Sequence, residues 1–190
     1  MDLPNRQSIR LNNYDYSHQG YYYITICTYQ RMYLFGTIKN DQMVLNQNGN
    51  IILSVWKSLP DHHNIELDKF QIMPNHIHGI IIIRLKSCGS HQKNSGGLRP
   101  APTLGMIVGF LKSESTKQIR KYIVGATRGS PVNERNTYVN RGSPDTIRYG
   151  YNMNIWQRNY YEHIIRNEKE LYSIRQYIIN NPKNWKNDEY

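Results

Sequence analysis

The chain has 190 residues, enough for one domain with a sizeable core, and a hydrophobic content of 38%. Its formal net charge of +10 favours a polyanionic partner, nucleic acid before a membrane surface. The longest strongly apolar run, residues 80–83, is far too short to span a bilayer, and the two cysteines lack the spacing of zinc ligands. Because the N-terminus has no signal-peptide pattern, we expect a cytoplasmic protein with free thiols.

Strand and helix patterns alternate along the chain. Runs rich in β-branched and aromatic residues predict the strands, and apolar residues at three- and four-residue spacing predict the helices. Thr103 is a candidate N-cap, and Pro60 and Pro182 are expected to end the helices before them. The predicted elements are a strand over 21–28, a hairpin of 34–38 and 43–45, a helix over 51–59, strands over 65–73 and 76–84, a helix from 104 to about 124, a strand with its lead-in over 155–166, and a helix from 167 or 168 to 181.

This alternation predicts an α+β, ferredoxin-like sandwich, with helices on one face of a mostly antiparallel sheet. We expect a single domain over residues 8–182, with tails at 1–7 and 183–190. Two stretches interrupt the periodic patterns, and we interpret them as flexible inserts at 86–103 and 125–154. Around Pro74 and Asn75, the two middle strands either pair as a hairpin or run on with a break.

The stretch with the most chemical content is 71–83, in which two histidines flank one isoleucine. Alternate side chains of an extended strand share a face, so His76 and His78 are expected to point the same way. Two neighbouring imidazoles can hold a divalent metal or a phosphate, although His-x-His on a strand is also common without either role. A second pair, His62 and His63, lies in a polar connection that we interpret as solvated surface.

The last predicted helix offers partners for this histidine pair. Tyr177 and Asn181 are four residues apart, at the edge of an apolar stripe formed by Leu171, Ile174 and Ile178. Asn181 can give a carbonyl oxygen as a third metal ligand, and Tyr177 can give a hydroxyl as a nucleophile. Mg²⁺ or Mn²⁺ suits such a ligand set and would assist a weak nucleophile, although imidazole alone suits zinc equally. The ordinary alternatives are packing for the tyrosine and helix capping for Asn-Asn-Pro.

Basic side chains near such a site are candidates for contacts with a DNA backbone. Lys112 and Arg120 lie on the polar face of the predicted helix from 104, and Arg158 precedes the last strand. A basic helix face is ordinarily just solvated. Trp156 and the neighbouring pair Tyr160-Tyr161 fit the core better than a platform for bases.

Three ordered motifs resemble the single-tyrosine HUH transposases, most closely the REP-associated tyrosine transposase branch. They are Met-Pro-Asn-His-Ile-His-Gly-Ile from residue 73, Trp-Gln-Arg-Asn-Tyr-Tyr-Glu-His-Ile-Ile-Arg from 156, and Tyr-Ile-Ile-Asn-Asn-Pro from 177. The resemblance implies that His76 and His78 bind the metal with Asn181 as third ligand, where many insertion-sequence relatives carry glutamine. It also implies that Tyr177 attacks single-stranded DNA, leaving a 5′-phosphotyrosine and a free 3′-OH.

The family resemblance implies a metal-dependent enzyme that binds hairpin single-stranded DNA, cleaves it and rejoins it. One alternative is a domesticated relative that binds hairpin DNA or RNA without cutting it. Another is a relaxase or replication initiator, although these HUH nucleases usually carry larger or additional domains. Family members occur as monomers and as homodimers that exchange the last helix, and the sequence does not distinguish these states.

Overall fold

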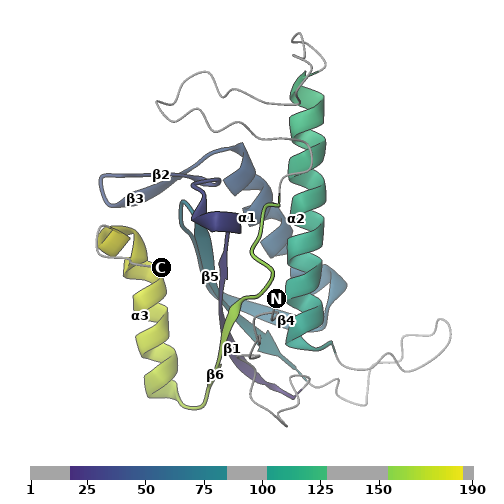
Figure 1. Cartoon of the computed structure of the whole chain (residues 1–190). Helices are drawn as coiled ribbons and strands as arrows, with labels where there is room; N and C mark the ends of the chain where they lie inside the picture. The colour runs from purple at the N-terminus through teal and green to yellow at the C-terminus, as the bar shows by residue number, and fades with distance from the viewer. Residues whose placement is uncertain (1–17, 85–101, 128–153, 186–190) are drawn as a thin grey trace, which may run out of the picture.

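The computed structural model describes residues 18–84, 102–127 and 154–185, which build a central sheet flanked by helices (Figure 1). Four strands form an antiparallel sheet in the order β4–β5–β1–β6, and β2 pairs with β3 in a separate hairpin. The elements are β1 (Gly20–Cys27), the 3-10 helix η1 (Tyr29–Arg31), β2 (Gly36–Lys39), β3 (Gln42–Leu45), α1 (Gln47–His62), β4 (Ile65–Ile72), β5 (His76–Ile83), α2 (Leu104–Thr127), β6 (Tyr161–Ile165) and α3 (Glu168–Asn184). The α+β class and the antiparallel sheet are as predicted.

Leaving aside the β2–β3 hairpin, the chain order from β1 to β6 is strand, helix, strand, strand, helix, strand, as in the ferredoxin-like motif. β4 and β5 pair as an antiparallel hairpin, which decides between the two alternatives for the strands around Pro74. Within the described residues, no helix is both long and apolar enough to cross a membrane.

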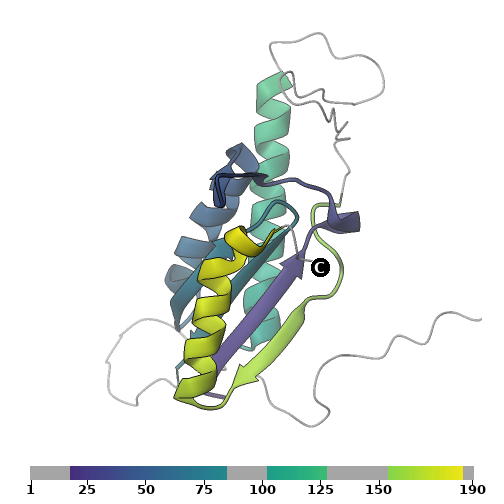
Figure 2. The ribbon, with the colours of Figure 1, turned by 90° about the vertical axis from the view of Figure 1, so that its left-hand side faces the viewer.

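The helices cover both faces of the sheet, so the expectation that they share one face is wrong for α3. Ile24 and Ile81 belong to the larger core, which they share with residues of α1 and α2. Tyr23 and Ile80, which point the other way, form a second core with α3 residues, and Figure 2 shows α3 in front of the sheet on that side. The reason is that β1 and β5 are apolar on both faces, and a strand of this kind needs a layer on each side.

The prediction that Pro60 and Pro182 end their helices is also wrong. α1 continues past Pro60 to His62, and α3 continues past Pro182 to Asn184. A proline near a helix end removes one backbone hydrogen bond, a loss that packing of the last turn can outweigh, and Pro182 is buried. The extension of α3 carries Trp185, which we had expected in a tail, next to the sheet.

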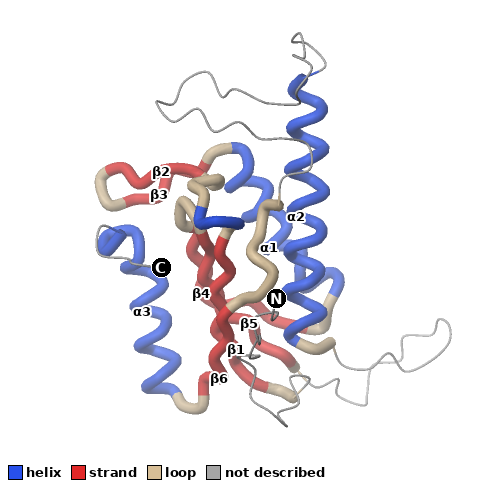
Figure 3. The backbone as a smooth tube through the Cα atoms, in the orientation of Figure 1, coloured by secondary structure: helices blue, strands red, loops and turns tan. Residues whose placement is uncertain are grey.

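Other element boundaries differ from the predicted ones by a few residues. α2 runs through Thr127 and so takes in the start of the second predicted insert. Strand β6 covers only the second half of the predicted 155–166, and Figure 3 shows the loop that leads into it. Thr103 caps α2 as expected, since its Oγ1 accepts a hydrogen bond from the N–H of Met106. Residues 1–7, 86–101, 128–153 and 186–190 lie outside the described residues, so the flexibility expected of the inserts stays a prediction.

Gly79 follows the histidine pair and leaves room for a large ring on the α1 side of the sheet. The indole of Trp56 stacks on Phe70 with ring centroids 4.2 Å apart and planes within 6°. A Cβ atom on Gly79 would lie 2.4 Å from Cη2 of Trp56, a separation that these atoms do not tolerate. The glycine therefore lets α1 pack closely behind the strand that carries the histidines.

Candidate metal centre and nucleophile

His76 and His78 point to the same face of β5, as the alternation of the strand predicts. Both are buried, with exposed fractions of 1% and 0%, and their Nε2 atoms lie 2.9 Å apart. Adjacent ligands of an octahedral ion with bonds of about 2.1 Å are about 3 Å apart, so the separation fits a shared Mg²⁺ or Mn²⁺. Within the described residues, no third His, Cys, Asp or Glu completes a cluster with them.

The second ring nitrogen of each histidine has a hydrogen-bond partner. Nδ1 of His76 lies 2.6 Å from Oδ1 of Asn75, an acceptor that favours the proton on Nδ1 and leaves the Nε2 lone pair available. Nδ1 of His78 lies 2.8 Å from the hydroxyl of Tyr23 and 2.9 Å from Oγ1 of Thr25. These hydroxyls can donate or accept, so they support the tautomer of His78 whose Nε2 can bind a metal.

Both imidazoles are held in the neutral form that metal binding requires. Burial, with a smaller contribution from the charge of Arg31, lowers the pKa of His76 to about 4. Burial, together with the neighbouring His76, lowers the pKa of His78 well below its usual value. Protons therefore compete weakly with a metal for this pair at neutral pH.

Tyr177 on α3 and its C-cap Trp185 contact the histidine pair, and Asn181 lies on the same side of the helix. The ring of Tyr177 lies 5.3 Å from that of His78, and the ring of Trp185 lies 6.0 Å from that of His76. Asn181 lies one turn after Tyr177 and one turn before Trp185, so it occupies the position between these contacts. The structure thus brings Tyr177 to the histidine pair, and helical spacing puts Asn181 on the same side of α3.

Asn181 has an unusual environment for an amide. The residue is 1% exposed, and its Oδ1 atom accepts no hydrogen bond from any described residue. A buried acceptor of this kind normally has a partner, because leaving it unpaired costs about 1–3 kcal/mol. A hard cation is a partner that fits an amide oxygen beside two imidazoles, so the residues present suit a divalent metal.

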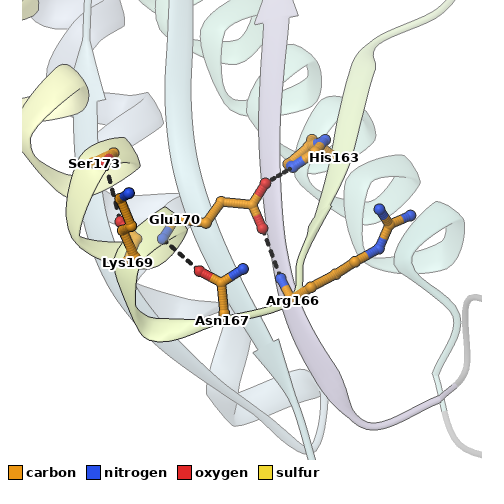
Figure 4. Close-up of polar contacts among 6 residues, drawn as sticks. All are labelled: His163, Arg166, Asn167, Lys169, Glu170 and Ser173. Atoms are coloured by element: carbon orange, nitrogen blue, oxygen red, sulfur yellow. Dashed lines mark hydrogen bonds and ion pairs between the residues drawn. The ribbon is translucent and has the colours of Figure 1, made fainter.

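The N-terminus of α3 is fastened to β6 by hydrogen bonds (Figure 4). Asn167 caps the helix by accepting from the N–H of Glu170 at 2.9 Å. The carboxylate of Glu170 accepts from the N–H of Arg166 at 2.8 Å and contacts Nε2 of His163 at 2.6 Å. The hydrogen bond from Arg166 is the main cause of the lowered pKa of Glu170, followed by that from His163. His163 therefore helps to hold the start of α3 against β6.

An ion pair fastens the middle of α3 to the edge strand β4. Arg175 donates from Nε and Nη2 to Oδ2 of Asp68, at 2.9 and 2.6 Å. Asp68 lies where a register shift interrupts the β4–β5 pairing. Together with the cap, this contact fixes the rotation of α3, and hence the direction in which Tyr177 points.

Two of the three basic residues predicted to contact DNA, Lys112 and Arg120, lie on the other side of the sheet from α3. Nζ of Lys112 donates to the carbonyls of Gln157, Arg158 and Asn159 at 2.8, 3.2 and 3.0 Å, which occupies all of its protons. Burial lowers the pKa of Lys112 to about 8. Lys112 and Arg120 belong to α2, across the sheet from α3, whereas the side chain of Arg158 is exposed. Contact with DNA remains a prediction for all three.

Several residues of the site were not found from the sequence. Tyr23 and Thr25 support His78 from the neighbouring strand, and this contact depends on how β1 pairs with β5, which the sequence does not show. Asn75 was noticed as a turn residue rather than a partner of His76. Trp185 was missed because a proline precedes it.

No family model matches the chain. An uncharacterized protein of Haemophilus influenzae is 36% identical to it over 98% of this chain and 93% of that protein. A predicted REP-associated tyrosine transposase of the same organism is 25% identical over 90% of this chain and 76% of that protein. The solved structure of a REP-associated tyrosine transposase bound to a REP hairpin matches with a TM-score of 0.56 and 15% identity, covering 95% of this chain and 74% of the other. The chain therefore belongs to the same family as the uncharacterized Haemophilus influenzae protein and resembles the REP-associated tyrosine transposases.

Proposed function

We propose that the protein is a metal-dependent transposase that binds hairpin single-stranded DNA and cleaves and rejoins it through a phosphotyrosine. The observation that carries this proposal is the convergence of Tyr177 and Asn181 on His76 and His78, about a hundred residues away in the chain. The similarity to REP-associated tyrosine transposases supports the reaction class. The net charge of +10 supports a nucleic-acid partner.

In the proposed cleavage step, the hydroxyl oxygen of Tyr177 attacks the phosphorus of one phosphodiester. A bond forms between the tyrosine oxygen and phosphorus, and the bond to the 3′ oxygen breaks. The products are a 5′-phosphotyrosine and a free 3′-OH, which takes up the proton that Tyr177 loses. Rejoining is the reverse step, with a 3′-OH as the nucleophile. A divalent ion held by His76, His78 and Asn181 would stabilise charge on the phosphoryl oxygens.

The hydroxyl oxygen of Tyr177 is buried in the absence of DNA. Its ring packs edge-on against Tyr23, with centroids 6.4 Å apart, and against His78. For a phosphodiester to reach this oxygen, the side chain must rotate or α3 must move away from the sheet. Because nucleophile and histidines belong to one chain, we propose that a single copy can form a complete site.

The proposed partner is a DNA hairpin with a single-stranded flank, since the REP-associated relative was solved with a REP hairpin. The decisive experiment incubates the protein with a panel of such hairpins and Mn²⁺ and looks for a covalent adduct on a denaturing gel. We expect an adduct that is absent with EDTA and in the variants Tyr177→Phe and His76→Ala. The adduct should still form in Tyr172→Phe, because Tyr172 is 64% exposed on the far side of α3. Hairpin binding without an adduct would instead favour a non-cleaving binding protein.

A further inference from the structure

A second group of side chains lies beside His76, apart from the residues proposed to bind metal or attack DNA. The ring of Trp185 lies 6.0 Å from that of His76, and Tyr33 packs edge-on against Trp185 with centroids 5.6 Å apart. Tyr33 is 57% exposed, so this aromatic surface is open to solvent. Figure 1 shows why two distant segments meet here: the C-terminal end of α3 and the short helix η1 lie at the same end of the sheet.

The helix η1 brings a positive charge to the same place. Arg31 is exposed, and its N–H donates to the carbonyl of Thr28 at 3.1 Å, in the segment that lies against the turn before His76. Gln30 and Arg31 have φ angles of 51° and 55°, which non-glycine residues adopt infrequently. Backbone of this kind persists only where surrounding contacts hold it, and it is concentrated at functional sites.

Hydrogen bonds hold this segment against the turn that precedes the histidine pair. The N–H of Thr28 donates to the carbonyl of Asn75 at 2.9 Å, and the N–H of Leu34 donates to the carbonyl of Pro74 at 2.9 Å. The hydroxyl of Thr28 also donates to the carbonyl of Asn75 at 2.9 Å. The positions of the segment and of the histidine strand are therefore coupled.

We propose that Arg31, Tyr33 and Trp185 form a subsite for single-stranded DNA, in which one base stacks on the aromatic surface and an adjacent phosphate pairs with the guanidinium. Aromatic rings beside a basic side chain are the combination that binds single strands without strong sequence preference. The planar guanidinium also matches the geometry of a phosphate. The subsite rests on the proposed function, because it holds the strand next to the phosphodiester to be cleaved.

Stacking is tested with Tyr177→Phe protein, which cannot cleave, and a DNA hairpin whose single-stranded flank carries 2-aminopurine at one position at a time. We expect one position at which fluorescence is quenched on binding, with the quench lost in Trp185→Ala and retained in Trp185→Phe. Trp185→Ala and Tyr33→Ala should each weaken binding by about fivefold or more, and Tyr172→Ala should not. If no position has a quench that depends on Trp185, the proposed stacking is wrong.

The phosphate contact is tested by the salt dependence of the same binding. Each phosphate neutralised on a single strand contributes about 0.7 to the slope of log K against log salt, so Arg31→Gln should lower the slope by about 0.7. Lys57→Gln, an exposed charge on α1 across the sheet, is the matched control and should leave the slope unchanged. An equal slope in wild-type and Arg31→Gln protein would overturn this contact.

The two proposals fail in different ways. If protein with Tyr177 intact forms no adduct on any hairpin, cleavage is wrong, while the binding measurements still decide the subsite. If the adduct forms but Arg31→Gln and Trp185→Ala bind like their controls, the subsite is wrong and cleavage stands. Mn²⁺ binding, measured on the same variants, shows whether loss of Trp185 has disturbed the metal site instead.

Discussion

The substitution Asn181→Leu distinguishes a metal ligand from a structural amide, because the two roles predict opposite changes in the stability of the metal-free protein. In the metal-free protein, the buried Oδ1 of Asn181 accepts no hydrogen bond from a described residue, at a cost of about 1–3 kcal/mol. Leucine is close to asparagine in size and removes that cost. We therefore expect metal-free Asn181→Leu to be more stable by about 1–3 kcal/mol, with a melting temperature about 2–4 °C higher for each kcal/mol.

The stabilisation that Mn²⁺ gives should be smaller in Asn181→Leu than in the wild-type protein. At a Mn²⁺ concentration a hundredfold above the dissociation constant, binding stabilises the wild-type protein by about 2.7 kcal/mol, and a hundredfold loss of affinity reduces this to about 0.4 kcal/mol. Thermal unfolding with and without Mn²⁺ measures both terms. Asn181→Asp keeps an oxygen ligand and should retain the Mn²⁺ response, while Asn180→Leu alters the neighbouring, less buried amide and should change neither term. A less stable metal-free Asn181→Leu with an undiminished Mn²⁺ response would refute the ligand role.

Three further changes test the surroundings of the site. Tyr23→Phe removes a hydroxyl that supports His78 and should weaken Mn²⁺ binding about 10–100-fold by calorimetry, whereas Tyr22→Phe, on the opposite face of β1, should not. The pKa of His76 is about 4 in the folded protein and 6.5 in the unfolded chain, so between these pH values the unfolded chain binds one more proton. Urea unfolding of the metal-free protein should therefore show full stability above pH 6.5 and a loss of about 3 kcal/mol near pH 4. A stability that does not change with pH would contradict the burial of His76. Gly79→Ala should destabilise the fold by about 1–3 kcal/mol in the same assay, because the added Cβ meets Trp56, and an unchanged midpoint would mean that the indole moves freely.

The histidine pair and the face of the last helix were predictable because local periodicity encodes them. Alternation along β5 puts His76 and His78 on one face whatever surrounds the strand, and helical spacing puts Tyr177 and Asn181 on another. The residues that support the metal site come from β1, and their contribution depends on strand register, which a single sequence does not reveal.

The remaining differences have two physical causes. Hydrophobic periodicity indicates the buried face of each element but not how many layers cover a strand. It therefore did not show that Ile80 needs a second layer of helix on its side of the sheet, which α3 provides. Rules for proline describe the backbone alone, so they ended α3 early and left Trp185 in a tail. Lys112 holds the connection before β6 through backbone carbonyls, and its contact with DNA stays a prediction.

The most direct test of the central claim is to identify the residue that becomes attached to DNA. After reaction with a hairpin and Mn²⁺, the adduct is digested with a nuclease and a protease, and the modified peptide is sequenced by mass spectrometry. We expect a nucleotide joined through its 5′ phosphate to the hydroxyl of Tyr177. A nucleotide on any other side chain, or an adduct that persists in Tyr177→Phe, would contradict cleavage by Tyr177.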